Sequence, residues 1–323
     1  MANRAAIALA ALLLTAAGPA EDFDPAFTLA DPGALAAMQG ELIASNADRY
    51  SRMTIPVTIE GQGPFRFMID TGSQATVVSR ALRDRLKLPT LGQATVVGMA
   101  SRKQVELVRL NGLEFASRMF DSLHAPMLEG QHMGADGILG LDSLQDLRVL
   151  IDFRQQTIAV DDAKALGGDR GYEIVVRARN KKGRLIITDA EIDGVRTAVV
   201  LDTGSQGSLG NLALQQRLRT RKGSEVTATD VTGSTITGRL DTPRALRIGG
   251  RGSAGTLQLE GLSLIYSDAP AFAALGLRDK PAMVLGIEDL RMFDRVAIDF
   301  AERTVLFDLP RGTRDAASSG TRL

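Results

Sequence analysis

The sequence contains no cysteine and no tryptophan, and phenylalanine and tyrosine are scarce. Without cysteine the chain has no disulfides, no thiol nucleophile and no thiolate metal ligands. The low aromatic content argues against the stacking platforms that bind single-stranded nucleic acid. Lys plus Arg equals Asp plus Glu at 38 each, so the formal charge is zero. We therefore expect neither nucleic acid nor an anionic membrane surface as a partner.

Histidine is also scarce, since His124 and His132 are the only two. With no thiolate and no third imidazole, we expect no metal site, and no organic cofactor is indicated. The glycine-rich residues 249–252 lack the Gly-Lys-Ser/Thr ending of a phosphate-binding loop. The sequences around Ser73 and Ser205 lack the Gly-x-Ser-x-Gly pattern of a nucleophilic serine.

Residues 1–20 have the layout of a secretory signal peptide. A basic start with Arg4 precedes an apolar run at 5–17, and small residues come before Glu21. This predicts a periplasmic or secreted protein, with an uncleaved N-terminal anchor as the alternative. Apart from this segment, no stretch is long and apolar enough to span a bilayer. Residues 21–50 lack a strand pattern and are interpreted as a linker or a pro-segment.

One short stretch occurs twice. Residues 67–74 read Phe-Met-Ile-Asp-Thr-Gly-Ser-Gln, and residues 199–206 read Val-Val-Leu-Asp-Thr-Gly-Ser-Gln. An apolar run predicts a buried strand, and a glycine after it predicts a tight turn. Each copy therefore places one carboxylate, that of Asp70 or of Asp202, at the end of a buried strand. A single capping aspartate would be ordinary, but a matched pair calls for a common explanation.

The surroundings of the stretch are duplicated as well. Four further kinds of segment recur in the same order. Helical patches lie at 80–88 and 212–218, and hairpins with small-residue tips at 98–102 and 231–234. Apolar-glycine segments lie at 137–141 and 283–287, and Ile-Asp-Phe segments at 151–153 and 298–300. We predict one lobe over residues 51–165, a second over 171–310 and a tail at 311–323. The second lobe carries about 14 extra residues, which we place at 251–261 and 268–277.

Four further aspartates need an interpretation. Asp152 and Asp299 end the two Ile-Asp pairs and are interpreted as structural. Asp136 and Asp142 have no counterparts of the same type in the second half and are interpreted as polar groups of loops.

The paired Asp-Thr-Gly-Ser motifs, each followed by a small-tipped hairpin and an apolar-apolar-glycine segment, resemble the aspartic peptidases of the pepsin-like and retropepsin-like type. The resemblance is strongest to a bacterial, exported, retropepsin-like protein with both lobes fused, and it covers residues 51–309. It implies an all-β acid-protease fold with two pseudo-symmetric β-barrel lobes and short helices. It also implies a monomer that is an intramolecular pseudo-dimer, with a peptide or protein substrate bound in an apolar cleft between the lobes.

The resemblance gives the motif residues their roles. Asp70 and Asp202 would be the catalytic dyad that activates a water, because two adjacent carboxylates share one proton. Thr71 and Thr203 would hydrogen-bond across the lobes. Gly72 and Gly204 would let the backbone approach the carboxylates and donate N–H groups. Ser73 and Ser205 would hydrogen-bond the outer carboxylate oxygens.

The hairpin tips would close over the bound peptide as flaps. The expected flap residues are Gly98, Met99, Ala100, Ser101, Val231, Thr232, Gly233 and Ser234. Neither tip has the tyrosine of a pepsin-like flap, which agrees better with the retropepsin pattern. Two alternatives to a general endopeptidase stay open: an inactive peptide-binding module on the same fold, and a peptidase whose main substrate is its own segment 21–50.

Overall fold

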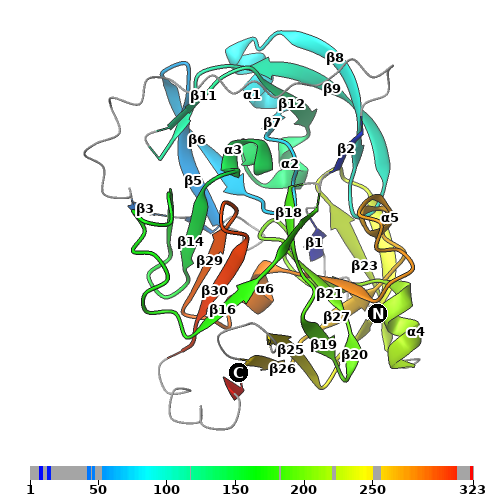
Figure 1. Cartoon of the computed structure of the whole chain (residues 1–323). Coiled ribbons are helices and arrows are strands. Elements are labelled where there is room, and N and C mark those ends of the chain that lie inside the picture. Colours follow the sequence, from blue (N-terminus) through cyan, green and yellow to red (C-terminus); the bar gives the residue numbers. More distant parts are fainter. Residues whose placement is uncertain are drawn as a thin grey trace.

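The structure, a computed structural model, describes residues 53–116, 118–181, 183–219, 223–249 and 256–310 (Figure 1). Outside these ranges it gives only the backbone of short strands, namely β1 (Ile7–Leu9), β2 (Leu13–Thr15), β3 (Leu42–Ala44), β4 (Asn46–Ala47) and β31 (Thr321–Arg322). The predicted signal peptide, the linker or pro-segment and the tail therefore lie outside the described residues, apart from these backbones. Strands predominate and helices are few and short, which confirms the predicted all-β class.

In the first half, two β-hairpins flank the first aspartate motif. Its strands are β5 (Met53–Ile59), β6 (Gln62–Ile69), β7 (Val77–Ser79), β8 (Thr90–Val97), β9 (Arg102–Leu110), β10 (Leu113–Phe115), β11 (Arg118–Phe120), β12 (Leu123–Leu128), β13 (Gly137–Leu139), β14 (Arg148–Asp152) and β15 (Thr157–Asp161). Its helices are α1 (Arg80–Leu86), α2 (Gly130–Met133) and α3 (Leu141–Leu144). Strand β13 pairs in parallel with β6 and antiparallel with β7, so it holds the strand before Asp70 beside the strand after it.

The second half repeats this arrangement. Its strands are β16 (Ile174–Arg177), β17 (Arg179–Lys181), β18 (Arg184–Ile187), β19 (Ala190–Ile192), β20 (Val195–Arg196), β21 (Ala198–Leu201), β22 (Ser208–Gly210), β23 (Ser224–Asp230), β24 (Thr235–Asp241), β25 (Ala245–Gly249), β26 (Thr256–Glu260), β27 (Leu264–Tyr266), β28 (Ala282–Leu285), β29 (Arg295–Asp299) and β30 (Thr304–Asp308). Its helices are α4 (Leu212–Leu218), α5 (Pro270–Ala274) and α6 (Ile287–Leu290). Strand β28 pairs in parallel with β21 and antiparallel with β22, as β13 does with β6 and β7.

The helices after the two motifs start at side-chain caps. Ser79 Oγ accepts a hydrogen bond from Leu82 N at the start of α1, and Asn211 Oδ1 accepts one from Leu214 N at the start of α4. Such caps satisfy amide groups that the first helical turn leaves without partners. Helices α1 and α4 lie where the helical patches were predicted, and α5 falls within the predicted insertion at 268–277.

The strand orders among the described residues show no closed barrel. The β-barrel form of the lobes and their boundaries at 165 and 171 therefore stay predictions. In the same part of the chain, no helix is both long and apolar enough to traverse a bilayer.

A sheet with the strand order β16-β30-β29-β14-β15-β3 joins the two halves, because β14 pairs antiparallel with β29. In this register Arg148 lies opposite Asp299, and the two form a buried ion pair with N–O distances of 2.8 Å. Asp152 Oδ1 accepts a hydrogen bond from Gln155 N in the turn after β14. Both aspartates thus have the structural contacts expected of them.

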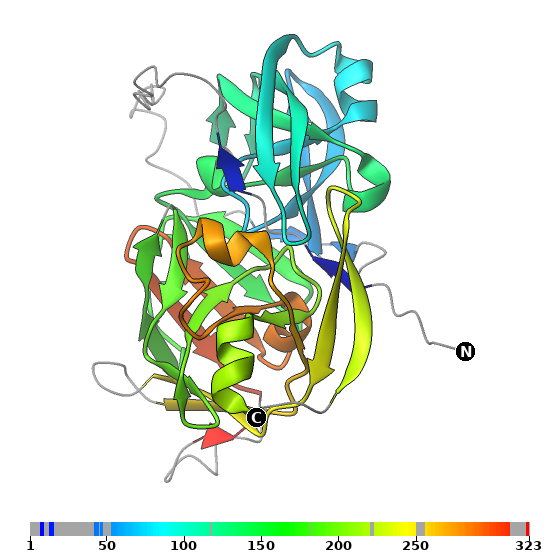
Figure 2. The same ribbon diagram turned by 90° about the vertical axis from the view of Figure 1, so that its right-hand side faces the viewer.

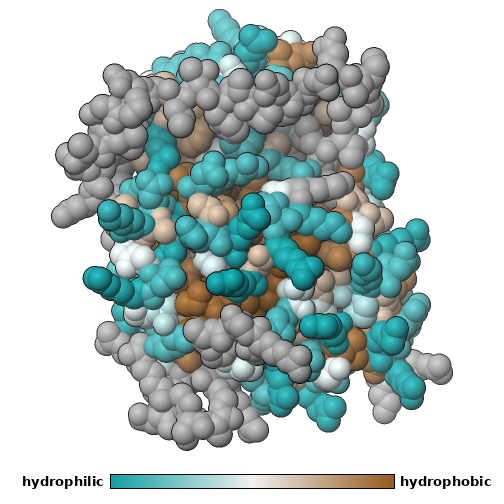
Figure 3. All heavy atoms as spheres, viewed as in Figure 1, coloured by the Kyte–Doolittle hydropathy of each residue, from teal (hydrophilic) through white to brown (hydrophobic). Residues whose placement is uncertain are grey.

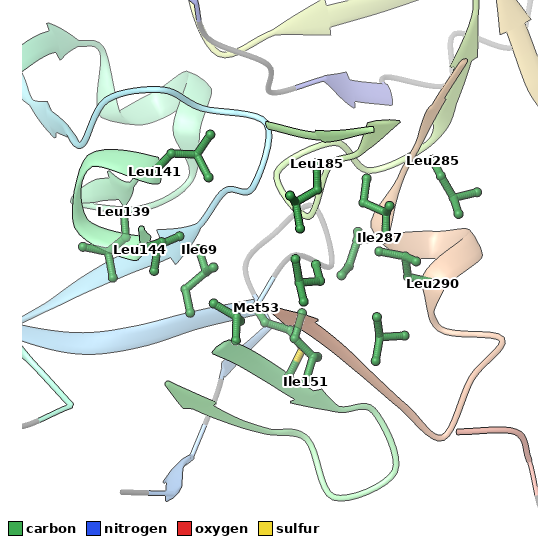
Figure 4. Packing of buried hydrophobic residues seen from close by; sticks show 14 of the residues in the cluster. Met53, Ile69, Leu139, Leu141, Leu144, Ile151, Leu185, Leu285, Ile287 and Leu290 are labelled. Carbon is green, nitrogen blue, oxygen red and sulfur yellow. The ribbon is translucent and has the colours of Figure 1, made fainter. Parts of the chain in front are cut away.

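One large hydrophobic cluster runs beneath both aspartate motifs. It includes Ile69 and Leu139 from the first half, and Leu285 and Ile287 from the second (Figure 4). Leu201, which precedes Asp202, belongs to the same cluster. Burial of this apolar surface stabilises the strands that carry the aspartates. On the surface, hydrophilic side chains spread between smaller hydrophobic patches (Figure 3).

Candidate active site

The two aspartates lie at the ends of β6 and β21, each held by the neighbouring parallel strand. Asp70 N donates to Leu139 O at 3.0 Å, and Asp202 N donates to Leu285 O at 3.1 Å. Both side chains are completely buried, with 0% exposure. A buried carboxylate is costly without compensating partners, so the surrounding groups decide its charge.

The two threonines tie the aspartate loops to each other. Thr71 Oγ1 donates to Leu201 O at 3.0 Å, and Thr203 Oγ1 donates to Ile69 O at 2.7 Å. Each hydroxyl also accepts from the other threonine's amide, at distances of 3.1 and 3.2 Å. The four hydrogen bonds fix the loops against each other across the two halves.

The two glycines bring the carboxylates to the contact between the loops. Gly72 N donates to Asp70 Oδ1 at 2.8 Å, and Gly204 N donates to Asp202 Oδ1 at 3.0 Å. A Cβ atom added to Gly72 would lie 2.4 Å from Asp202 Oδ2, and one added to Gly204 would lie 2.4 Å from Asp70 Cγ. Each carboxylate therefore packs against the glycine of the opposite loop, where no larger residue fits.

The pKa of Asp202 is raised well above its usual value. Burial is the main cause, followed by the negative charge of Asp70 and a hydrogen bond with it. The charge of Arg184 and the amide of Ser205 act in the opposite direction. Two interacting carboxylates titrate as a pair, so the pair retains a shared proton to a higher pH than a free aspartate would.

The two serines differ from the expectation. Ser73 Oγ donates to Ala75 O, and Ser205 Oγ donates to Gly207 O, both at 2.8 Å. A hydroxyl can donate one hydrogen bond, and here the carbonyl oxygen two residues ahead accepts it. A serine reaches an aspartate carboxylate through its backbone instead, since Ser205 N donates to Asp202 Oδ1 at 3.0 Å.

The two hairpin tips, at residues 98–101 and 231–234, reach toward each other from opposite halves (Figure 2). Ser101 Oγ donates to Ser234 Oγ at 2.8 Å, and Lys103 Nζ donates to Thr232 O at 3.3 Å. Asp230, which the sequence analysis missed, accepts from Ala100 N at 3.0 Å. The other oxygen of Asp230 accepts from the amide and hydroxyl of Thr232. A carboxylate just before a run of small residues is the sequence signal that could have found it.

Each tip also buries apolar side chains in the opposite half. Val231 belongs to a cluster of first-half residues that includes Met133 of α2. Val97 and Met99 belong to a cluster of second-half residues that includes Phe272 of α5. The tips are thus locked to each other by polar contacts and anchored by exchanged apolar ones.

Asp142 is not a loop group, contrary to the sequence interpretation. It lies in α3, and its Oδ1 accepts hydrogen bonds from Thr76 N at 2.8 Å and Thr76 Oγ1 at 2.7 Å. Burial raises the pKa of Asp142 to about 6. Asp136 does lie in a loop, where its Oδ2 accepts from Arg66 N at 2.8 Å.

Arg184 is the second residue that the sequence analysis missed. Its buried guanidinium donates from Nε to Gly72 O at 2.7 Å, and Nη2 donates to the same oxygen. An arginine that opens an apolar strand has no local signal for such a contact, because the two residues are 112 positions apart. Among the residues that the structure describes, no group of three or more His, Asp or Glu side chains could hold a metal ion.

Residues 55–143 match the model of a family described as aspartyl protease. The matched segment contains the Asp70 loop, the first hairpin tip and Gly140, and it ends before the Asp202 loop. The match supports an aspartic peptidase family and a protease-type function. A search of curated proteins finds no match to the chain.

Proposed function

We propose that this protein is an aspartic endopeptidase that hydrolyses peptide bonds with a water held between Asp70 and Asp202. The observation that carries the proposal is the reciprocal packing of two fully buried carboxylates, each against the glycine of the opposite loop. Two loops cross-linked by Thr71 and Thr203 fix that geometry before a substrate arrives. The family match on the first loop agrees with this chemistry.

The reaction uses the pair in its singly protonated form. One carboxylate accepts a proton from the water while the water oxygen attacks the scissile carbonyl carbon, and the protonated carboxyl donates to the carbonyl oxygen. The tetrahedral intermediate then breaks its C–N bond: the leaving amine takes a proton from the pair, and a hydroxyl of the intermediate returns a proton to the pair as the carbonyl re-forms. Because the pKa of Asp202 is raised, the singly protonated pair persists above the titration range of a free aspartate. Activity should therefore persist above the titration range of a free aspartate, and should fall when the pH rises above the higher pKa of the pair or drops below the lower one.

The remaining features follow from this proposal. Each half supplies one aspartate, so a monomer with pseudo-twofold symmetry suffices as the working enzyme. The substrate is a peptide or protein segment, and the interlocked tips must separate to admit it. An exported bacterial peptidase of the periplasm or the medium fits the signal-like residues 1–20.

Cleavage of a peptide library by the wild type and by Asp70→Asn and Asp202→Asn tests the proposal. Each single substitution should abolish cleavage, because one carboxylate with an amide cannot hold the shared proton in the required form. Asp268→Asn is the matched control, since Asp268 lies in an exposed ion pair with Arg278 and should leave cleavage unchanged.

A wild type that binds peptides and cuts none across acidic and neutral pH overturns the proposal in favour of a peptide-binding module. Mass spectrometry of the mature N-terminus tests the self-processing alternative. A start near residue 50 in the wild type, absent in Asp70→Asn, would show that the chain cuts itself.

A further inference from the structure

Arg184 lies in the second half, yet it holds the aspartate loop of the first. It begins strand β18, its side chain is 1% exposed, and both Nε and Nη2 donate to Gly72 O. Two donors on one carbonyl oxygen fix the orientation of that peptide group more firmly than one donor does.

Gly72, like Gly204 in the other loop, contacts both aspartates. Its N–H donates to Asp70 Oδ1, and its Cα faces the Asp202 carboxylate. The guanidinium on its carbonyl oxygen is therefore close to both carboxylates. Burial, the largest effect, lowers the pKa of Arg184 to about 10, although the charges of Asp70 and Asp202 act in the opposite direction. Arg184 is thus a cation throughout the pH range in which aspartates titrate.

A nearby cation would favour the ionised form of the aspartate pair. Burial and mutual repulsion both favour the neutral form of Asp202, whereas the proposed reaction requires one ionised carboxylate in the pair. The charged groups that act on Asp202 are Asp70, which opposes ionisation, and Arg184, which favours it. Among the residues that the structure describes, Arg184 is the cation that favours the ionised form of Asp202 and so acts against the effect of burial.

Another buried arginine shows that this role is not a general one. Arg148 donates to the carboxylates of Asp299 and Asp169, which is the usual way to compensate a buried guanidinium. Arg184 instead directs both Nε and Nη2 to a backbone oxygen of the aspartate loop. In addition, Arg184 stands 18 residues before Asp202 (202 − 184), and Arg52, outside the described residues, stands 18 before Asp70 (70 − 52). The duplicated motif thus includes an arginine in both copies.

We propose that Arg184 is a positioning residue for the aspartate pair, which orients Gly72 through its two donors and keeps one carboxylate ionised through its charge. This inference rests on the proposed function for its catalytic meaning, but the charge effect can be measured without turnover.

The direct test is an NMR titration of the aspartate carboxyl carbons in wild type, Arg184→Met and Arg184→Gln, with the dyad signals assigned from Asp70→Asn and Asp202→Asn. Loss of the cation should raise the apparent pKa values of the pair by about one unit or more. Arg295→Met is the matched control: it removes a partly buried arginine that pairs with Asp308 and should not move the pair. Because two different neutral residues are tested, the titration can still be carried out if one of the two variants does not fold.

Arg184→Lys separates charge from geometry. It keeps a cation and loses the fixed pair of donors, so the pKa values of the pair should stay near those of the wild type while kcat falls by about tenfold. In the neutral variants the acidic limb of the kcat/KM profile should shift to higher pH by the same amount as the NMR pKa values.

Unchanged pKa values of the pair in Arg184→Met or Arg184→Gln would overturn the inference, even if activity falls, because a structural role alone predicts that result. A wild type without peptidase activity would overturn the proposed function instead. The titration would then still decide whether Arg184 sets the charge of the pair.

Discussion

The aspartate loops and the hairpin tips are two regions built from the same duplication, and they have diverged to different extents. In the loops, three kinds of contact occur twice: the threonine bonds, the glycine amides and the glycine–carboxylate packing. In the tips, a carboxylate occurs once. Asp230 N donates to Ser234 O across the second tip, and Gly98 N donates to Ser101 O across the first. The first tip thus has a glycine where the second has an aspartate.

The difference follows from what each region must do. Two carboxylates can share a proton only when both approach from equivalent positions, so a change in one loop disturbs the pair. In the proposed enzyme the tips need only meet and separate, so one side can supply the carboxylate and the other the space for it. A Cβ atom on Gly98 would lie 2.3 Å from Asp230 Oδ2, which shows how closely that space is filled.

The apolar contacts of the tips show the same divergence. Val231 packs with Met133 of α2, a short helix after β12, whereas Met99 packs with Phe272 of α5, in the inserted segment after β27. Both tips bury a side chain in the opposite half, but the insertion in the second half provides a larger cluster for the first tip.

The equivalence of the loops predicts the largest effect. Gly72→Ala and Gly204→Ala should each reduce kcat/KM by at least about a hundredfold, and by similar amounts, because each adds a methyl group at 2.4 Å from the opposite carboxylate. Steady-state kinetics on a cleavable peptide measures this. Gly261→Ala is the control for the general cost of replacing a glycine: its φ of +76° strains an alanine, but nothing lies within 4 Å of the added Cβ atom, so no clash with a carboxylate arises. A large loss in one loop variant and none in the other would show that the loops are not equivalent.

Much of this comparison could be read from the sequence, because it depends on local signals. The repeated apolar-Asp-Thr-Gly stretch located both loops, and the helical patches at 80–88 and 212–218 located the helices that follow. The small residues at 98–101 and 231–234 located the tips. These signals are turns and periodicities within a few residues of each other.

What the sequence could not provide are the contacts between residues far apart in the chain. Arg184 reaches Gly72, and Asp230 reaches Ala100, over more than a hundred residues in each case. Ser73 illustrates a different limit: residue types alone do not show whether its hydroxyl donates to the Asp70 carboxylate, as expected, or to Ala75 O, as found. The backbone conformation therefore decides contacts that residue types leave open.

The hydrogen bonds beneath the aspartate loops predict the next effect, which is on protein stability. Six residues after Asp70 and Asp202, Thr76 donates to Asp142 and Ser208 donates to Asp289. The pKa of Asp142 is raised to about 6, so the folded state binds more protons than the unfolded state between about pH 4 and pH 6. Its contribution to stability is complete below the unfolded pKa and is lost as the pH rises through the folded pKa.

Asp142→Asn should remove this dependence, so that the drop in the free energy of unfolding between pH 4 and pH 7 becomes smaller by about 3 kcal/mol at most. The oxygen of the introduced amide could still accept from Thr76. Urea unfolding at both pH values measures the difference. Asp289→Asn extends the comparison, because burial raises the pKa of Asp289 as well and the change should have the same sign. An unchanged pH dependence in Asp142→Asn would mean that the carboxyl of Asp142 does not titrate in this range.

The single carboxylate of the tips predicts the smallest effect. Asp230→Ala removes the acceptor for Ala100 N, so hydrogen exchange of the Ala100 amide should become faster by about tenfold, the equivalent of one charge-assisted hydrogen bond. Gly98→Ala alone should disturb the same contact by crowding Asp230 Oδ2, whereas Gly98→Ala combined with Asp230→Ala has no such clash. The two substitutions should therefore be non-additive, with the double variant exchanging no faster than Asp230→Ala.

The amide of Asp202, which donates to Leu285 O at the base of the second loop, is the internal control, and its exchange should not change. Equal acceleration at Asp202 would mean that the tips and the loops open as one unit, and the independence of the two regions would then be wrong.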